Sequence, residues 1–223
     1  MVSGPGLVLD FDGTILDTEQ PLFQAWSEVW DAHGHQLALS DWQQNIGTED
    51  TFDPRQELER RLGRALDSDV NDRRMVRRDQ IQARYRPRAG VVRWLAAAHH
   101  SGVPVGVASS SPRAWVEGHL TRLGLRGYFS CLVCTDGVVP AKPAPTSYRL
   151  ACERLGADPW QSVAVEDSPH GVAAAVTAGL FTVAIPHGLT VGLDLSAADL
   201  VSDSLDRLDL TETLAKAALR ADR

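Results

Sequence analysis

The sequence predicts an α/β protein built on a doubly wound parallel sheet, with a helical module inserted after the first strand. From Gly90 onward, short apolar runs alternate with longer stretches of helical periodicity, the pattern of a parallel sheet covered by helices. Before Gly90 there is one short apolar run, Leu7–Leu9, and the residues that follow it have helical spacing. A parallel crossover needs only about a dozen residues, so the much longer insert is expected to form a module of its own.

Composition limits the classes of function. The chain has 223 residues, of which 43% are apolar, enough for a sizeable core, and its formal charge is −7. This acidic balance argues against a polyanion-binding surface, so we expect no nucleic-acid partner. No apolar stretch approaches the length of a membrane-spanning helix, and no basic segment precedes an apolar one at the N-terminus. We therefore expect a cytoplasmic protein that binds no membrane and, because no exposed apolar stripe is evident, a monomer.

The insert is predicted to hold four helices. The first has apolar residues at helical spacing from Leu22 to His33. Ser40 to Gln43 has capping-box spacing, and Asp53-Pro54 resembles an N-cap with its first helical residue. The fourth, very basic helix is expected from about Val70 to Tyr85, and its run Arg73, Arg74, Arg77 and Arg78 is interpreted as a solvent-exposed face.

The remaining elements alternate. Strands are expected at Val103–Ala108, Cys131–Cys134, Val163–Val165, Phe181–Ile185 and Leu200–Val201. Helices are expected at Val91–His100, Arg113–Leu123, Ser147–Leu155, Gly171–Ala178 and Leu205–Leu219. Gly124 and Gly156 follow helix-ending leucines, as C-terminal glycines do. Cys131 and Cys134 are spaced as CxxC, but on a strand they point to opposite faces, so we interpret them as buried structural thiols.

Acidic residues follow the first strand directly, in Asp10-Phe11-Asp12-Gly13-Thr14. In open α/β sheets the carboxyl ends of the strands are where ligands bind. Of two carboxylates at alternate positions, one can attack phosphorus or bind a metal while the other moves a proton. An ordinary Asp-Gly turn is the alternative interpretation of this segment taken alone.

Three further segments stand after the strands of the same sheet. Ser109 is expected at a strand tip, where its hydroxyl and the adjacent amides, including that of Ser110, could hold a phosphoryl group; Ser111-Pro112 looks like an N-cap. Lys142 lies between prolines, where it could act as a point charge on phosphate. Glu166 and Asp167 follow a buried strand, and buried acids require a partner, for which a metal is the economical choice.

In this order, DFDGTILDTE, a serine at the second strand tip, KPAP and VEDSPHG closely resemble the haloacid dehalogenase superfamily. The insert falls where the branch with β-phosphoglucomutase and sugar-phosphate phosphatases has its α-helical cap. The resemblance implies a Rossmann-like catalytic core of residues 1–16 and 88–223, and a cap of residues 17–87. It also implies an Mg²⁺ cofactor and a small phosphorylated metabolite as substrate.

The resemblance assigns roles to the motif residues. Asp10 would be the nucleophile that becomes an aspartyl phosphate, and Asp12 the general acid and base. Ser109, Ser110 and Lys142 would hold the transferring phosphoryl group. The Mg²⁺ ligands would be the Asp10 carboxylate, the Asp12 main-chain carbonyl and Asp167, with Glu166 as support.

The sequence departs from this family at several positions. Thr146 replaces the aspartate of the KPAPD form, and His170 stands where an asparagine is frequent. Leu22 occupies the place of the mutase cap histidine, and Gly47 is followed by Thr48, Glu49 and Asp50 without the mutase arginine. Trp26 still matches the cap type. We therefore predict an Mg²⁺-dependent phosphatase acting on a sugar or polyol phosphate, with a β-phosphoglucomutase-like mutase as the alternative.

Two other classes of protein fit the sequence less well. A response-regulator receiver would carry its phosphoacceptor on a middle strand and would have no insert after the first strand. A non-catalytic relative would be expected to lose Asp10, Asp12 or Lys142, and all three are present. Substrate identity stays open, although the acidic cap loop Gln44–Asp53 disfavours a second phosphate on the substrate.

Overall fold

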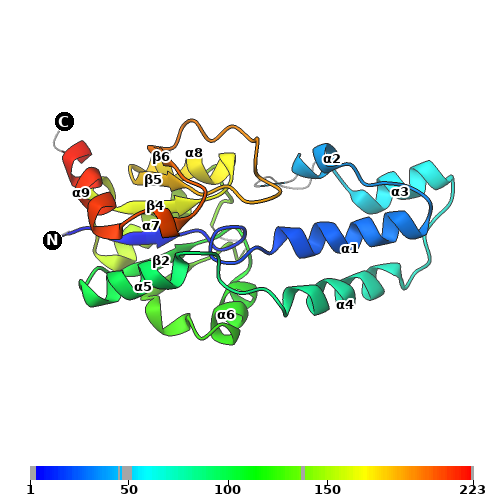
Figure 1. Ribbon diagram of the computed structural model, residues 1–223, viewed down its shortest axis with the longest axis horizontal. Coiled ribbons are helices and arrows are strands. Elements are labelled where there is room, and N and C mark those ends of the chain that lie inside the picture. The colour runs from blue at the N-terminus through cyan, green and yellow to red at the C-terminus, as the bar shows by residue number, and fades with distance from the viewer. Residues whose placement is uncertain (1–3, 45, 47–51, 137–138, 222–223) are drawn as a thin grey trace.

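The computed structural model describes residues 4–44, 46, 52–136 and 139–221. In this part of the chain a six-stranded parallel sheet has the order β3-β2-β1-β4-β5-β6 (Figure 1). The strands are β1 Leu7–Leu9, β2 Val105–Ala108, β3 Cys131–Val133, β4 Val163–Glu166, β5 Phe181–Ala184 and β6 Leu200–Val201. The predicted fold class and strand set are confirmed, with ends displaced by one or two residues.

β1 is a central strand, and its register explains where the motifs meet. Leu9 pairs with Val107 of β2 on one side and with Val165 of β4 on the other. The residues that follow these three strands therefore emerge side by side at the carboxyl edge of the sheet.

Two hydrophobic layers cover the sheet. Leu7 and Leu9 pack in the layer that contains buried residues of α5, α6 and α9, whereas Val8 packs with α7 and α8. The helices of this core are α5 Val91–His100, α6 Arg113–Arg122, α7 Thr146–Leu155, α8 Pro169–Ala178 and α9 Leu210–Ala221. Alternate residues of a strand face opposite sides, so this division shows a sheet covered on both faces.

The insert packs around a cluster of its own. Its helices are α1 Glu19–Ala32, α2 Leu39–Gln43, α3 Pro54–Leu62 and α4 Val70–Gln82, and Figure 1 shows them grouped at one end of the molecule. Trp26, Trp30 and Trp42 are buried there, and Leu189 from the loop after β5 joins them. Gln43 Nε2 donates to the Leu189 carbonyl at 2.8 Å. The cap boundaries at residues 17 and 87 stay a prediction.

Several local expectations are borne out. Asp53 caps α3 by accepting from the amides of Arg55 and Gln56. Gly124 and Gly156 have the left-handed conformation that helix ends require, with φ of 71° and 65°. Cys131 and Cys134 pack on opposite layers, and burial raises the pKa of Cys134 to about 11, as expected of a structural thiol. No helix among the described residues is long and apolar enough to span a membrane.

Other expectations were wrong. Ser40 does not cap α2, because it lies inside the helix, which begins at Leu39. Ala38 occupies the N-cap position and makes no side-chain hydrogen bond there. The segment Leu205–Leu219 is not one helix: Leu208 is extended, and its carbonyl accepts from the side chains of Arg93 and Trp94. Arg74 is not solvent-exposed, since its guanidinium lies 4.9 Å from the ring centroid of Trp26.

Candidate active site

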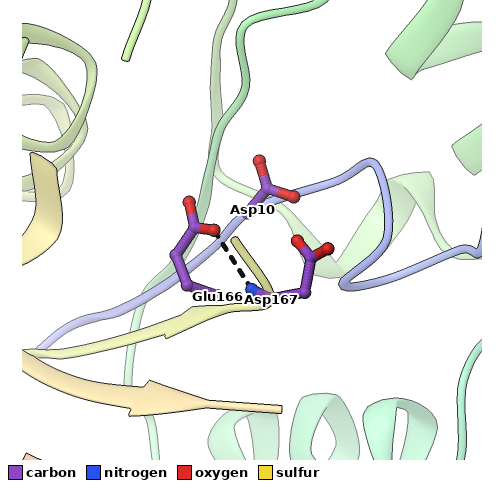
Figure 2. Close-up of side chains that lie close together, drawn as sticks. All are labelled: Asp10, Glu166 and Asp167. Atoms are coloured by element: carbon purple, nitrogen blue, oxygen red, sulfur yellow. Dashed lines mark hydrogen bonds between the residues drawn. The ribbon is translucent and has the colours of Figure 1, made fainter. Parts of the chain in front are cut away.

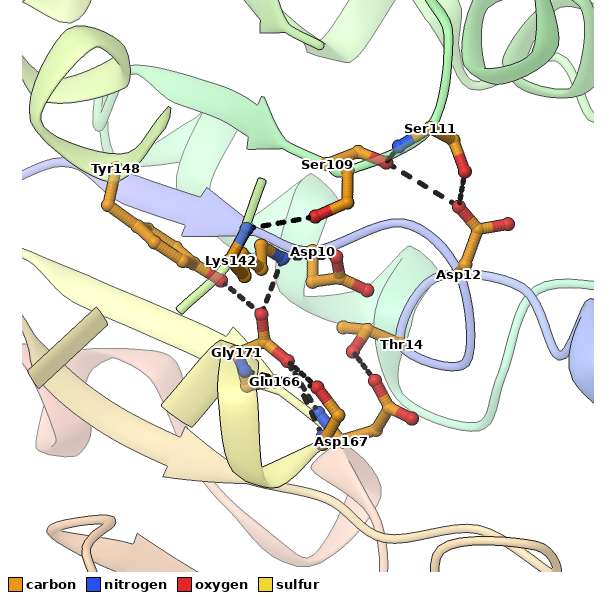
Figure 3. Close-up of polar contacts among 12 residues, drawn as sticks. Asp10, Asp12, Thr14, Ser109, Ser111, Lys142, Tyr148, Glu166, Asp167 and Gly171 are labelled. Atoms are coloured by element: carbon orange, nitrogen blue, oxygen red, sulfur yellow. Dashed lines mark hydrogen bonds and ion pairs between the residues drawn. The ribbon is translucent and has the colours of Figure 1, made fainter. Parts of the chain in front are cut away.

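The carboxyl edge of the sheet gathers the predicted polar residues (Figure 3). The amide of Asp10 donates to Val165 at 3.0 Å, and that of Ser109 donates to Val133 at 2.9 Å. These bonds continue the parallel ladders by one residue and fix both side chains at the strand tips. Lys142 reaches the same place from the loop between β3 and α7.

Lys142 lies between two buried carboxylates. Its Nζ donates to Asp10 Oδ1 and, at 2.5 Å, to Glu166 Oε1. Burial by itself would lower the pKa of Lys142, but the charges of Asp10 and Glu166 outweigh it and hold the pKa above its usual range. The ammonium group therefore stays charged and is held directly beside Asp10.

Glu166 has donors on both oxygens. Oε1 accepts from Lys142 and, at 2.7 Å, from Tyr148 Oη, while Oε2 accepts from the Asp167 amide at 3.1 Å. The Glu166 carboxylate lies so close to Gly171 that a Cβ there would overlap it, which explains the glycine in the EDSPHG segment. With its lone pairs used in this way, Glu166 supports Lys142 and Asp167 and has little capacity left for a metal.

The carboxylates of Asp10, Glu166 and Asp167 offer oxygens that all lie within 4.8 Å of one another (Figure 2). Asp10 Oδ2 is buried and has no hydrogen-bond partner among the described residues. Burial chiefly raises the pKa of Asp10 well above its ordinary value, opposed by Lys142 and reinforced by Glu166, Asp167 and Asp12. An unpartnered buried oxygen beside several acids suits a hard divalent cation, so these residues fit a metal of that class.

Asp167 is held by two neighbours. Thr14 Oγ1 donates to its Oδ1 at 3.1 Å, and His187 Nε2 lies 3.1 Å from its Oδ2. Gly13 has φ of +83°, and a Cβ at that position would meet the Asp167 carboxylate. The glycine of the first motif is therefore needed both for the turn and for the approach of Asp167.

Asp12 accepts hydrogen bonds on both oxygens as well. Thr18 Oγ1 and Trp115 Nε1 donate to Oδ1 at 2.7 and 2.9 Å. Ser111 and Ser109 hydroxyls donate to Oδ2 at 2.6 and 3.5 Å. The interpretation of Ser111 as an N-cap was wrong, because the N-cap position of α6 is Pro112 and the Ser111 hydroxyl is turned to Asp12 instead.

The two serines expected at the phosphate have different surroundings. Ser109 is buried, and its Oγ accepts from the Ser111 amide at 3.0 Å. Ser110 is exposed; its Oγ accepts from the Lys142 amide at 3.3 Å, and its carbonyl accepts from Thr135. Ser110 thus ties the lysine loop to the β2 tip, which is its most evident structural role.

Sequence reasoning missed several contacting residues: Thr14, Thr18, Ser111, Trp115, Tyr148 and His187. Thr14 lies inside the first motif and Ser111 stands next to Ser109 and Ser110, so both could have been included. Trp115, Tyr148 and His187 come from other elements and carry no local signal of their own.

The positions that bear on the family branch divide into two groups. Leu22 packs against the insert cluster, and Thr146 begins α7, which has no acidic residue in its first turn. Gly47, Thr48, Glu49 and Asp50, the loop residues expected to contact substrate, lie outside the described residues.

Glu19 does lie near the site: burial, with the charges of Asp12 and Asp167, raises its pKa to about 7.

The chain is similar to known proteins over most of its length. A model of the haloacid dehalogenase-like hydrolases matches residues 5–179. The YhcW protein of Bacillus subtilis is 37% identical over 92% of this chain and 93% of its own. Fructose-1-phosphate phosphatase YqaB of Escherichia coli is 33% identical over 80% and 94%, respectively. A crystal structure of an HAD family hydrolase from Deinococcus radiodurans, with bound phosphate and sodium, has a TM-score of 0.77 and 26% identity over 99% of each chain.

Proposed function

Because the chain belongs to the haloacid dehalogenase-like hydrolases, we propose that it is an Mg²⁺-dependent phosphatase that hydrolyses a sugar or polyol phosphate through an aspartyl-phosphate intermediate. The observation that carries this proposal is the arrangement of Asp10, whose carboxylate is fixed by Lys142 on one oxygen and unpartnered on the other among the described residues.

Asp10 is the nucleophile in this proposal. Its carboxylate attacks phosphorus, an Asp10 O–P bond forms, and the bond from phosphorus to the substrate oxygen breaks. Lys142 reduces the repulsion between the attacking carboxylate and the phosphate dianion and, with the Ser109 hydroxyl, binds the transferring group. Both side chains are buried beside Asp10 or at the neighbouring strand tip, so they need little rearrangement to do this.

Asp12 is the general acid and base. It gives its proton to the departing substrate oxygen and then takes a proton from the water that attacks the aspartyl phosphate, which releases inorganic phosphate and restores Asp10. Its four hydrogen-bond donors fix where the carboxylate stands for these two proton transfers.

Asp10, Asp167 and the Asp12 main-chain carbonyl would hold the Mg²⁺ ion, which would neutralise charge on the phosphoryl oxygens. The buried, unpartnered Asp10 oxygen supports this ligand set. Glu166, whose oxygens already accept from Lys142, Tyr148 and the Asp167 amide, supports the site without binding the ion.

The surroundings of the site favour a substrate with a single phosphate. Glu19 lies near Asp12 and Asp167, and Asp17 adds to the negative field around it. With a pKa of about 7, Glu19 is partly ionised near neutral pH. Its ionised form repels a second phosphate, and its oxygens can accept hydrogen bonds from sugar or polyol hydroxyls. The names of relatives such as fructose-1-phosphate phosphatase support the same class.

The test is a panel of hexose and polyol monophosphates with Mg²⁺, in which inorganic phosphate release gives kcat/KM. Asp10→Asn is the control and should be folded but inactive, since an amide is a poor nucleophile. β-Glucose 1-phosphate is assayed for both free phosphate and glucose 6-phosphate, with a bisphosphate primer present. Faster formation of glucose 6-phosphate than of phosphate would contradict the phosphatase proposal and favour the mutase.

A further inference from the structure

Trp115 on α6 contacts both the proton-transfer residue and the helical insert. Its indole N–H donates to Asp12 Oδ1 at 2.9 Å. On its ring, the Arg78 guanidinium carbon from α4 lies 5.1 Å from the centroid. His119 packs edge-on against the same indole at 4.2 Å between centroids. One side chain of the core thus bridges Asp12 to α4 of the insert.

The chemistry of the indole fixes the direction of its contact with Asp12. An indole N–H donates and cannot accept, so Asp12 Oδ1 accepts from Trp115 whenever this contact is made. The other donors to the carboxylate are the hydroxyls of Thr18 at Oδ1 and of Ser109 and Ser111 at Oδ2, and a hydroxyl can donate or accept. Of these four side chains only Trp115 has a fixed donor role, so its bond orients the carboxylate in one way.

The Arg78 contact gives the bridge a second fixed end. Arg78 is held by Asp79 on its own helix, with Nη2 and Oδ1 2.7 Å apart, and its side chain is 19% exposed. A cation stacked on an indole at this distance is attracted by the ring, so α4 helps to hold the plane of Trp115. Because the N–H lies in that plane, the stack also constrains the direction of the bond to Asp12.

We propose that Trp115 is a positioning residue for proton transfer: its hydrogen bond to Oδ1 orients the Asp12 carboxylate, and Arg78 of the insert holds Trp115 in that orientation. This inference rests on the proposed function. In the forward step the proton leaves the Asp12 carboxyl group for the substrate oxygen as the bond from phosphorus to that oxygen breaks. In hydrolysis the proton returns from the attacking water.

The inference predicts a dependence on the leaving group. An alkyl phosphate releases a strongly basic oxygen that needs the proton of Asp12, whereas p-nitrophenyl phosphate releases a stable phenolate that does not. A Trp115→Phe variant keeps an aromatic ring but loses the N–H. It should lower kcat/KM for an alkyl phosphate by roughly 10- to 100-fold, the effect of a misplaced catalytic group. The kcat/KM for p-nitrophenyl phosphate should change little, because kcat/KM reports only the steps up to formation of the aspartyl phosphate.

The matched controls come from the same chain. Trp160→Phe removes an indole from an exposed position, and Arg73→Met removes an exposed arginine from α4; neither should alter the ratio of kcat/KM for the alkyl phosphate to kcat/KM for the aryl phosphate. Arg78→Met should lower this ratio by about 3- to 10-fold, the effect of one lost cation–π contact. In the Trp115→Phe background it should have no further effect on the ratio, because the bond that it orients is already gone.

Asp12→Asn separates failure of the inference from failure of the proposed function. If Asp12→Asn lowers kcat/KM for both substrates equally, Asp12 is not the general acid, and the acid role in the proposed function and the inference fail together. If Asp12→Asn is selective for the alkyl phosphate but Trp115→Phe is not, only the inference is overturned. Additive effects of Trp115→Phe and Arg78→Met on the ratio would overturn the part assigned to Arg78.

Discussion

Replacing Lys142 by methionine tests the charge balance of the site without reference to any substrate. Lys142 Nζ lies between Asp10 and Glu166, and the three side chains are 5%, 8% and 0% exposed. Methionine keeps the length of the aliphatic chain and removes the charge. Two buried carboxylates would then face each other without their cation, and breaking a buried pair in this way costs about 3–5 kcal/mol of unfolding free energy.

The loss should depend on pH in a defined direction. The pKa of Asp10 is already raised by burial, while Lys142 lowers it, so the variant should have a still higher Asp10 pKa in the folded state. A folded pKa above the unfolded one gives stability that is present at low pH and lost as pH rises through the folded value. The destabilisation should therefore be larger at pH 8 than at pH 5, changing by up to about 1.4 kcal/mol per pH unit.

Urea unfolding in EDTA at several pH values measures this free energy, and the chelator prevents a cation from replacing the ammonium group. The matched control is Lys216→Met, which removes the chain's other lysine from an exposed position on α9 and should change the free energy by less than about 0.5 kcal/mol. A Lys142→Met loss below about 1 kcal/mol at pH 8, or a loss that is the same at pH 5 and pH 8, would refute the reasoning.

Two further outcomes are expected. Gly171→Ala should displace the Glu166 carboxylate, which occupies the space that a Cβ at residue 171 would need. The variant should have lower activity, and its unfolding free energy should fall by about 1–3 kcal/mol. A fully active, equally stable variant would contradict the support role of Glu166. Activity should require Mg²⁺ and be inhibited by Ca²⁺, because calcium takes more ligands at longer distances and would draw on both Asp10 oxygens. Equal rates with the two metals, or full activity after chelation, would contradict the proposed metal role.

The sheet could be predicted from the sequence because its strands are short apolar runs, and polar residues stand at the ends of β1, β2 and β4. Residues such as Asp10, Ser109 and Glu166 are positioned by the register of neighbouring parallel strands, and that register follows from chain order and burial. Lys142 has no strand of its own at the site, but prolines flank it and its loop leads into α7.

The departures from prediction have a common physical origin in tertiary contacts. Ser111 precedes a proline as a helix cap would, but its hydroxyl donates to Asp12 at 2.6 Å. A hydrogen bond to a carboxylate is stronger than a hydrogen bond between a neutral hydroxyl and a helix amide. Arg74 stands in a run of arginines that predicts a solvent-exposed face, but its guanidinium, on α4, packs over the ring of Trp26 on α1. In both cases the partner comes from another element, and periodicity within one element contains no information about it.

The same argument explains why the motif residues could be predicted from the sequence and the positioning residue Trp115 could not. Asp10, Asp12 and Asp167 are close to strand ends and Lys142 stands before a proline-rich turn, so local sequence pattern locates them. Trp115 acts from the first turn of α6, and an aromatic residue in a helix is ordinarily interpreted as packing. Its hydrogen bond to Asp12 depends on how α6 is placed against the first motif loop, and its stack on Arg78 depends on how the insert folds back onto the core. The proton-transfer geometry is thus set by the packing of the insert against the core, whereas the position of the nucleophile is set by the sheet.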